Sequence, residues 1–407
     1  MRILFFSDNF PPETNAAATR VYERAVYWVK WGHEVTVITC APNFPYGKLF
    51  DGYNNSWYQV EFLNGIKIVR VKTYIAANQG VLRRSLDFVS YLLTGTIAGL
   101  FQPRPDIVTA TSPQFFAAVA GWLVAELKNK PFVFELGDLW PSSISAVGAM
   151  KKGVLLYLLE KFELFLYRRA SSVAALTNSF KNNLVGRNIS ADKIHVVMNG
   201  VDLGRYQPKS RNEKLAKELG LDDKFVVGYI GTHGMAHGLS NVLDAADLLR
   251  DKPDIIFLFV GAGAERKNLI AESEQRGQTN VIFSPAQPKD HMPDIWSLCD
   301  LALVHLKDSC AFADVLPSKM FEAMAMGLPI LLVSPKGEAS DLVQSHGAGE
   351  WVPAGNPGLF SDVVGLLSQD KLKCELLAKA SQNAAPQHSR ENQARKMLEV
   401  FRWSLSR

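Results

Sequence analysis

The 407-residue sequence predicts an α/β protein built from two doubly wound parallel sheets. The first observation is length, since a chain of this size usually forms two domains of about 100–200 residues each. The second is that short apolar runs alternate with helical patterns along the chain, which is typical of parallel strands connected by helices. The third is a polar segment containing Gly and Pro, residues 199–212, which separates two such series.

The first series opens with a strand–helix–strand unit. An apolar strand at residues 3–6 is followed by a helix that reaches about Trp31 and ends at Gly32, and then by a second strand at residues 35–39. Further buried strands are expected at residues 66–71, 107–110, 132–135, 173–175 and 194–197. Together these elements predict one α/β domain over residues 1–200.

The second series predicts another α/β domain over residues 205–385. Its apolar strands are expected at residues 226–230, 255–260, 281–283, 301–305 and 329–333. The last helix, residues 386–407, is expected to return to the first domain. Doubly wound sheets bind ligands at the carboxyl ends of their strands, so two of them should face a central cleft, and the polar residues that follow strands are the candidates for function.

Composition excludes several classes of protein. Hydrophobic residues make up 47% and charged residues 21%, which indicates a globular chain, and the net charge of +4 is too mild for nucleic acid as the principal ligand. The four cysteines lie far apart, which argues against a disulfide framework or a zinc knuckle. We expect a cytoplasmic protein without signal peptide or transmembrane helix, because the longest uncharged run contains a Ser-Pro turn. The first strand lacks a following Gly-x-Gly-x-x-Gly, which disfavours a NAD-dependent dehydrogenase.

The strongest local constellation of polar residues surrounds one predicted helix. A loop with Asp314 leads into this helix, and Pro317 suits its first position. Lys319 and Glu322 are three residues apart and therefore share a helix face. The positive helix N-terminus and Lys319 would attract a phosphate, and Glu322 could accept hydrogen bonds from ribose hydroxyls. The alternative is an ordinary amphipathic helix with a solvated Lys–Glu pair.

Asp314 and Glu322, eight residues apart, resemble a known family signature. It is the Glu-x7-Glu motif of the retaining nucleotide-sugar glycosyltransferases of family four, which have two Rossmann domains and the GT-B fold; Asp314 replaces the first Glu. The resemblance implies that Asp314 is the sugar-side acid and Glu322 the ribose ligand. The Pro317-Ser318-Lys319 sequence is similar to the branch that makes bacterial O-antigen and capsule, including N-acetylfucosamine transferases, where Lys319 would contact the diphosphate.

Other motifs resemble the same family in the same order along the chain. They are Gly32-His33-Glu34-Val35, Asn199-Gly200-Val201-Asp202, Gly228-Tyr229-Ile230-Gly231 with His233-Gly234, and Gly261-Ala262-Gly263-Ala264-Glu265. The resemblance implies that the donor site is lined by Gly231, His233, Gly234, Gly261, Gly263, Glu265, Pro317, Ser318, Lys319 and Glu322. Many members carry an Arg and a Lys in the stretch that corresponds to residues 232–238, which has neither here. Lys319, the helix dipole and His233 or His237 are expected to neutralise the diphosphate instead.

The acceptor side is expected in the first domain. Residues 135–141 look like the Arg-Asp-Leu-Trp-Pro motif of the same branch, with Gly137 in place of Arg. Asp138 follows a parallel strand and could orient or deprotonate the acceptor hydroxyl, and the alternative is an Asp that caps the next helix. The expected acceptor-binding residues are Asn15, Ala16, Asn43, Ser112 and Trp140.

Two features bear on the metal and on the membrane. No Asp-x-Asp occurs in the sequence, so we expect no metal and a leaving group stabilised by Lys319, backbone N–H groups and the helix dipole. Residues 81–97 and 153–169 combine apolar helix faces with Arg pairs. This pattern suits peripheral contact with the inner membrane and a lipid-linked acceptor, and buried helices with polar ends are the alternative.

The sequence therefore predicts a retaining glycosyltransferase of bacterial surface polysaccharide synthesis, such as lipopolysaccharide O-antigen or capsule. It would move a sugar, such as an N-acetylated deoxyhexosamine, from a UDP-sugar to a polyprenyl-diphosphate-linked glycan, without a further cofactor. Asp138, Asp314 and Lys319 are expected to carry the chemistry. One alternative is a UDP-sugar 2-epimerase of the same fold, and another is a non-catalytic subunit that binds a nucleotide sugar.

Overall fold

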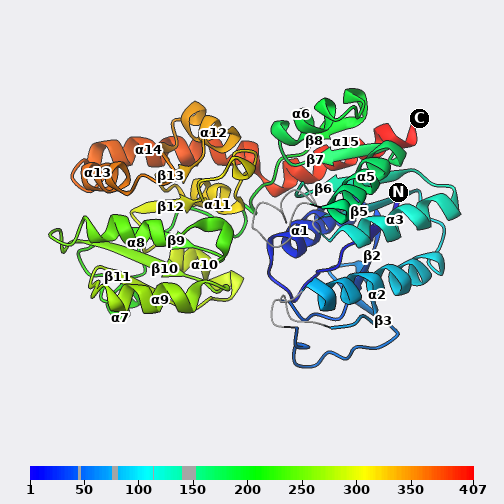
Figure 1. The fold of residues 1–407 in the computed structure, drawn as a ribbon, viewed down its shortest axis with the longest axis horizontal. Coiled ribbons are helices and arrows are strands. Elements are labelled where there is room, and N and C mark those ends of the chain that lie inside the picture. The colour runs from blue at the N-terminus through cyan, green and yellow to red at the C-terminus, as the bar shows by residue number, and fades with distance from the viewer. Residues whose placement is uncertain (45–46, 76–80, 113, 140–152) are drawn as a thin grey trace. The chain divides into compact units, whose positions relative to one another are not determined.

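The structure is a computed structural model of the chain, and it describes residues 1–44, 47–75, 81–112, 114–139 and 153–407. Within these ranges no helix is long and apolar enough to cross a membrane. The chain forms two compact units, the first made of Met1–Asn199 with Arg390–Arg407 and the second of Gly200–Ser389 (Figure 1).

Unit 1 contains an eight-stranded sheet with the order β3-β4-β2-β1-β5-β6-β7-β8. The strands are β1 (Arg2–Phe6), β2 (Glu34–Cys40), β3 (Tyr58–Leu63), β4 (Ile66–Val71), β5 (Ile107–Thr111), β6 (Phe132–Leu136), β7 (Ser172–Ala175) and β8 (Ile194–Val196). All pairs are parallel except β3 with β4, which are joined through Asn64 and Gly65, both at positive φ. The sequence analysis missed β3 because this edge strand is mostly exposed and lacks a buried apolar run.

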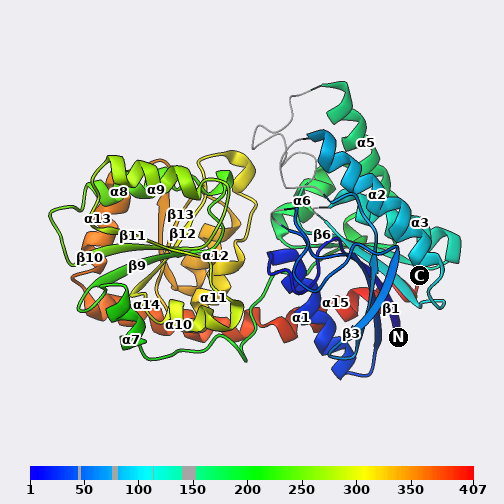
Figure 2. The same ribbon diagram turned by 90° about the horizontal axis from the view of Figure 1, so that it is seen from below.

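Helices cover both faces of this sheet, so alternate strand residues pack into two cores. The helices are α1 (Ala16–Lys30), α2 (Val81–Leu100), α3 (Phe115–Lys128), α5 (Val154–Arg169), α6 (Asn178–Gly186) and α15 (Arg390–Leu405). Leu4 and Phe6 pack on the face that α3 covers, whereas Ile3 and Phe5 pack on the face that α1 and α15 cover. Trp28 of α1 donates to the carbonyl of Ala394 at 3.0 Å, and this bond helps to fix α15 beside α1 (Figure 2).

Unit 2 contains a six-stranded, all-parallel sheet with the order β11-β10-β9-β12-β13-β14. Its strands are β9 (Phe225–Ile230), β10 (Ile255–Val260), β11 (Val281–Ser284), β12 (Leu301–His305), β13 (Ile330–Ser334) and β14 (Gly349–Pro353). The edge strand β14 was not predicted, since its sequence, GEWVP, contains no continuous apolar run. The strand order reverses at β9, which has β10 on one side and β12 on the other. Such a switch point is where open α/β sheets bind ligands.

The helices of unit 2 are α7 (Glu213–Glu218), α8 (Ser240–Asp247), α9 (Arg266–Gln275), α10 (Met292–Trp296), α11 (Ser318–Met326), α12 (Glu338–His346), α13 (Pro357–Leu367) and α14 (Lys371–Ala384). The central strands are apolar on both faces, and the burial of all six residues of β10 shows why its sequence, IIFLFV, has no polar alternation. Every strand predicted from an apolar run is present in the two sheets, which confirms the predicted fold class.

Candidate functional site

The loops after β9 and β10 approach each other closely in unit 2. Gly231 follows β9 and Gly261 follows β10, with φ of +140° and +152°. A Cβ atom on Gly261 would overlap the carbonyl oxygen of Gly231 and lie 3.4 Å from His233 Nε2. Backbone hydrogen bonds join the loops, since His233 N donates to Ala262 O at 2.9 Å and Glu265 N donates to His233 O at 3.0 Å. Side chains are excluded here by both the backbone conformation and the space.

Lys319 reaches the same place from α11. A Cβ atom on Gly231 would lie 2.9 Å from Lys319 Nζ. This nitrogen lies 3.6 Å from the centroid of the Tyr229 ring and is buried without a hydrogen-bond partner among the described residues. Burial lowers the pKa of Lys319 to about 7, although the charge of Glu322 acts in the opposite direction. A solvated Lys–Glu pair, the alternative left open by the sequence, is therefore wrong.

Glu322 lies half-buried one turn further along α11. Its Oε2 accepts a 3.4 Å hydrogen bond from the indole N–H of Trp296, a fully buried residue of α10. This contact orients the carboxylate from one side. An ionised carboxylate retains further lone pairs, so Glu322 can accept additional hydrogen bonds from a ligand's hydroxyl groups.

Asp314 is half-buried in the loop that leads into α11. This loop packs on the turn before α12, where Glu338 N donates to the Ala313 carbonyl at 3.3 Å and a Cβ atom on Gly337 would overlap the same oxygen. Pro317 has an extended conformation and precedes the first helical residue, Ser318, so its predicted place inside the helix is wrong by one residue. No side chain caps α11, whose first N–H groups lack intrahelical acceptors.

His233 contributes a buried imidazole to the same loops. The residue is fully buried, and neither ring nitrogen has a hydrogen-bond partner in the described part of the chain. Burial, followed by the charges of Lys319 and Arg266, lowers the pKa of His233 to about 4, so the ring is neutral at pH 7. Gly234 comes next and has ordinary contacts, whereas a Cβ atom on Gly263 would overlap the His233 backbone.

Two residues of this site were missed by the sequence analysis. Tyr229 supplies the ring under Lys319, and Arg266 donates through Nε to the Gly261 carbonyl at 3.1 Å. Arg266 directly follows the Gly-x-Gly-x-Glu sequence, which was a signal that could have identified it. Its charge helps to lower the pKa of the neighbouring His233.

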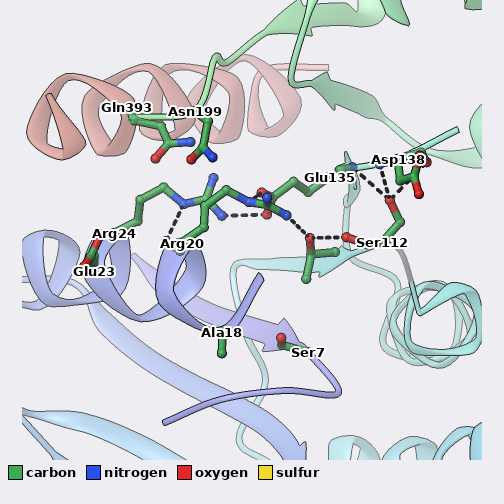
Figure 3. Close-up of polar contacts among 12 residues, drawn as sticks. Ser7, Ala18, Arg20, Glu23, Arg24, Ser112, Glu135, Asp138, Asn199 and Gln393 are labelled. Atoms are coloured by element: carbon green, nitrogen blue, oxygen red, sulfur yellow. Dashed lines mark hydrogen bonds and ion pairs between the residues drawn. The ribbon is translucent and has the colours of Figure 1, made fainter. Parts of the chain in front are cut away.

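Among the candidate acceptor residues of unit 1, Ser112 and Asp138 are in direct contact, whereas Asn15 and Asn43 make hydrogen bonds within their own segments. Ser112 Oγ accepts hydrogen bonds from Gly137 N at 2.8 Å and Asp138 N at 3.3 Å, which joins the loops after β5 and β6 (Figure 3). Asn15 caps α1 by accepting from Ala18 N at 3.0 Å, and Ala16 is the exposed first residue of that helix.

Asn43 and Trp140 differ from the other acceptor candidates. The buried Asn43 donates to the Ala41 carbonyl at 2.9 Å, so this side chain shapes its own loop. Glu13 holds the same loop by accepting from the backbone N–H groups of Asn43 and Phe44 at 2.9 and 2.8 Å. Trp140 lies outside the described residues.

A buried ion network lies directly beneath this part of unit 1. Glu135 accepts from Arg20 Nε at 2.7 Å and from Arg24 Nη2 at 2.6 Å, and Arg20 also donates to Thr111 (Figure 3). Burial alone would raise the pKa of Glu135, but the two guanidinium groups outweigh it and lower the pKa. Arg390 pairs with Glu23 at 2.8 Å and thereby ties α15 to α1. The sequence could not reveal this network, because its members come from distant segments.

The described residues contain no cluster of three or more His, Cys, Asp or Glu side chains that could hold a metal ion. The polar groups of unit 2 form instead a cationic cradle, defined here as Gly231, His233, Gly261, Arg266 and Lys319. Its charges and small loops suit an anionic ligand such as a phosphate.

Comparison with known proteins places the chain in a family. Residues 17–205 match the family described as Glycosyltransferase Family 4, and residues 210–387 match Glycosyl transferases group 1. The putative colanic acid biosynthesis glycosyl transferase WcaI of Escherichia coli K12 is 29% identical over 335 residues, which cover 80% of this chain and 82% of that protein. A GDP-mannose-dependent alpha-mannosyltransferase of Mycobacterium tuberculosis is 23% identical and covers 94% of this chain and 92% of its own.

Solved structures show the same fold at low sequence identity. HepE of Anabaena in complex with UDP has a TM-score of 0.71 at 18% identity and covers 99% of this chain and 100% of its own. Sucrose-phosphate synthase of Thermosynechococcus elongatus has a TM-score of 0.78 at 16% identity, with 98% of each chain covered. A putative UDP-N-acetylglucosamine 2-epimerase of Listeria monocytogenes has a TM-score of 0.61 at 14% identity, covering 98% and 95%. The chain is therefore a glycosyltransferase of family 4 (group 1) with the GT-B fold.

Proposed function

We propose that this chain is a retaining glycosyltransferase that transfers a sugar from a UDP-sugar to a polyprenyl-diphosphate-linked glycan of a bacterial surface polysaccharide. Unit 2 binds the donor and unit 1 the acceptor, at the cytoplasmic face of the inner membrane. The observation that carries the proposal is the buried Lys319 ammonium, which has no hydrogen-bond partner in the described structure and lies where two glycine loops meet the uncapped N-terminus of α11.

The donor's diphosphate is proposed to bind in the cationic cradle. Lys319 and Arg266 supply positive charge, and the N-terminal N–H groups of α11 supply hydrogen-bond donors. Glu322, oriented by Trp296, binds the ribose, and Asp314 contacts the sugar, for which an N-acetylated deoxyhexosamine is the proposed identity. HepE binds UDP and UDP-glucose in the solved complexes, which supports UDP, whereas the mycobacterial relative uses GDP-mannose. The experiment below therefore compares both bases.

The leaving diphosphate is proposed to be stabilised without a metal. As the sugar–phosphate bond breaks, negative charge develops on the diphosphate, and donors that are already in place stabilise it most effectively. Lys319 and Arg266 are held in place by burial and by the Gly261 carbonyl. Transfer rates measured with EDTA should equal those measured with Mg²⁺. A rate that falls to background in EDTA and recovers with Mg²⁺ would contradict this part of the proposal.

The acceptor hydroxyl is proposed to meet Asp138. Ser112 fixes the Asp138 backbone after β6, so the carboxylate is anchored close to the carboxyl ends of β5 and β6. Asp138→Asn should lower the transfer rate more than the affinity for the donor. Asn15, Ala16, Asn43 and Trp140 remain proposed acceptor residues, of which Asn15 and Asn43 act through the loops that they hold.

Contact with a membrane is proposed on the α2–α5 surface of unit 1, defined by its exposed apolar side chains. They are Leu86, Val89, Leu93, Ile97 and Leu100 on α2, and Val154, Tyr157, Leu158 and Phe165 on α5. Their helical spacing places each set on one face, and exposed Arg168 and Arg169 end α5. Ring contacts of α3 with both helices keep them in one layer, which Figure 2 shows. Such a surface would suit anionic lipid and a lipid-linked acceptor.

Calorimetric titration with UDP, GDP and ADP tests the donor site. Lys319→Ala and Glu322→Ala should each abolish tight binding of one nucleotide, while Lys371→Ala, at the exposed start of α14, should leave binding unchanged. Binding that survives in both site variants would overturn the assignment of the donor to α11.

Turnover assays then separate the alternatives. Transfer of a donor sugar to a polyprenyl-diphosphate glycan, with retention seen by NMR of the anomeric proton, supports the proposal. Epimerised UDP-sugar formed without acceptor would indicate a 2-epimerase, the activity named for the putative Listeria enzyme of the same fold. Tight nucleotide binding without transfer to any acceptor of a panel would indicate a non-catalytic subunit.

A further inference from the structure

Tyr229 holds Lys319 in an unusual way for a buried cation. The Lys319 Nζ atom lies 3.6 Å from the centroid of the Tyr229 ring, over its face. The ring itself is fixed, because Tyr229 lies in β9, is 1% exposed, and donates its hydroxyl to the Thr232 carbonyl at 2.8 Å. The negative face of an aromatic ring attracts a cation without accepting its N–H bonds in the manner of a carboxylate.

The ammonium therefore keeps the donors that point away from the ring. In the part of the chain that the structure describes, Nζ has no hydrogen-bond acceptor and forms no salt bridge within 4.0 Å. Gly231 keeps the adjacent space open, since even a Cβ atom there would lie 2.9 Å from Nζ. An ammonium group has three donors, so a ligand with several anionic oxygens is the complement that this position lacks.

We propose that Tyr229 is a positioning residue for the donor's diphosphate: its ring holds the Lys319 ammonium beside Gly231 in place of a carboxylate, so that the N–H donors that point away from the ring remain available to phosphate oxygens. A carboxylate partner would neutralise the charge and compete with the ligand, whereas a ring does neither. The inference rests on the proposed role of Lys319 in donor binding and deepens it by naming the residue through which Lys319 is placed.

The surroundings of Lys319 predict that diphosphate binding is coupled to proton uptake. The titratable groups that interact with it are Tyr229 on β9, His233 and His237 after β9, His305 on β12, and Glu322 on its own helix. Arg266 on α9 acts on the neighbouring His233. Burial is the main cause that lowers the pKa values of the three histidines, to about 4, 3 and 4, so they are neutral at pH 7. Burial also lowers the pKa of Lys319 to about 7, and a bound diphosphate would raise it again.

The test compares Tyr229→Phe, which keeps the ring and loses the hydroxyl, with Tyr229→Leu, which loses the ring. UDP and GDP are titrated at about pH 6 and pH 8 in two buffers of different ionisation enthalpy, which measures proton uptake. For the wild type we expect more proton uptake at pH 8 than at pH 6, because the unbound Lys319 is more deprotonated at the higher pH. Tyr229→Phe should bind within about twofold of the wild type, and Tyr229→Leu about tenfold more weakly. Adding Lys319→Ala to Tyr229→Leu should cost less than Lys319→Ala alone.

A matched control separates positioning from damage to the fold. Tyr206→Leu removes another buried Tyr of unit 2 and should lower thermal stability without weakening nucleotide binding. Wild-type affinity and proton uptake in Tyr229→Leu, combined with loss of binding in Lys319→Ala, would overturn the role of Tyr229 and leave the donor site standing. Full binding in Lys319→Ala would instead overturn the donor site itself.

Discussion

Replacing Glu135 with Gln should sharply destabilise unit 1. Glu135 is 1% exposed, and its two carboxylate oxygens accept from Arg20 at 2.7 Å and from Arg24 at 2.6 Å. The amide of Gln removes the negative charge and leaves two buried guanidinium groups without a counter-ion. Removing one partner from a buried ion pair costs about 3–5 kcal/mol, which for a domain of about 150–250 residues lowers the melting temperature by about 6–20 °C.

Differential scanning calorimetry and urea unfolding followed by circular dichroism would measure this effect. The matched control is Glu126→Gln, because Glu126 also pairs with an Arg in unit 1, at 2.8 Å from Arg169, but both side chains are exposed. The control should lose less than about 1 kcal/mol. The arginines lower the pKa of Glu135 in the folded protein below its ordinary value of 4.5. The carboxylate therefore contributes fully to the free energy of unfolding above pH 4.5, and this contribution is lost as the pH falls through the folded pKa. The difference between wild type and Glu135→Gln should therefore shrink in acid. A Glu135→Gln loss no larger than that of Glu126→Gln would refute the reasoning.

Three further predictions follow from other parts of the structure. Gly231→Ala should weaken nucleotide binding at least about tenfold, because the new Cβ meets Lys319 and φ is +140°. Gly358→Ala in α13, where the nearest contact lies at 3.7 Å, should bind normally in the same titration. Burial raises the pKa of Glu163 to about 7, so ionisation of this carboxyl lowers the free energy of unfolding progressively between pH 4.5 and 7. Glu163→Gln should therefore flatten the pH dependence of urea unfolding in that window. An unchanged profile would contradict the raised pKa. Leu93→Glu on the α2–α5 surface should reduce co-sedimentation with anionic vesicles. Leu248→Glu, at an equally exposed position of unit 2, should leave it unchanged. An equal reduction in both variants would argue against membrane contact through this surface.

The hydrophobic pattern of the sequence predicted the buried strands but not two of the edge strands. A buried parallel strand needs apolar residues on both faces, so β10 and β13 are visible in the sequence as continuous apolar runs. The edge strands β3 and β14 are exposed or half-buried and have no such run. These strands form because their backbones pair with β4 and β13. Backbone pairing does not require a particular side-chain pattern, so it cannot be recognised in the strand's own sequence.

Helix α11 shows the same difference between what the sequence and the structure reveal. The sequence placed Lys319 and Glu322 on one helix face, and α11 confirms that spacing. It left open whether Lys319 was solvated, because burial depends on what covers the helix. The covering groups are Tyr229 and Gly231, which are some ninety residues earlier in the chain.

By itself the sequence determined the fold class, the family and the placement of Lys319 and Glu322 on one helix. These properties depend on local periodicity, turn chemistry and short motifs, which a linear chain records directly. Only the tertiary structure shows that the Lys319 ammonium packs over the Tyr229 ring and that Arg266 donates to the Gly261 carbonyl. It also shows that Glu135 forms ion pairs with two arginines. The physical reason is that burial and charge pairing are set by side chains brought together from distant segments, and the pKa of a lysine or a glutamate depends on those neighbours rather than on its own motif.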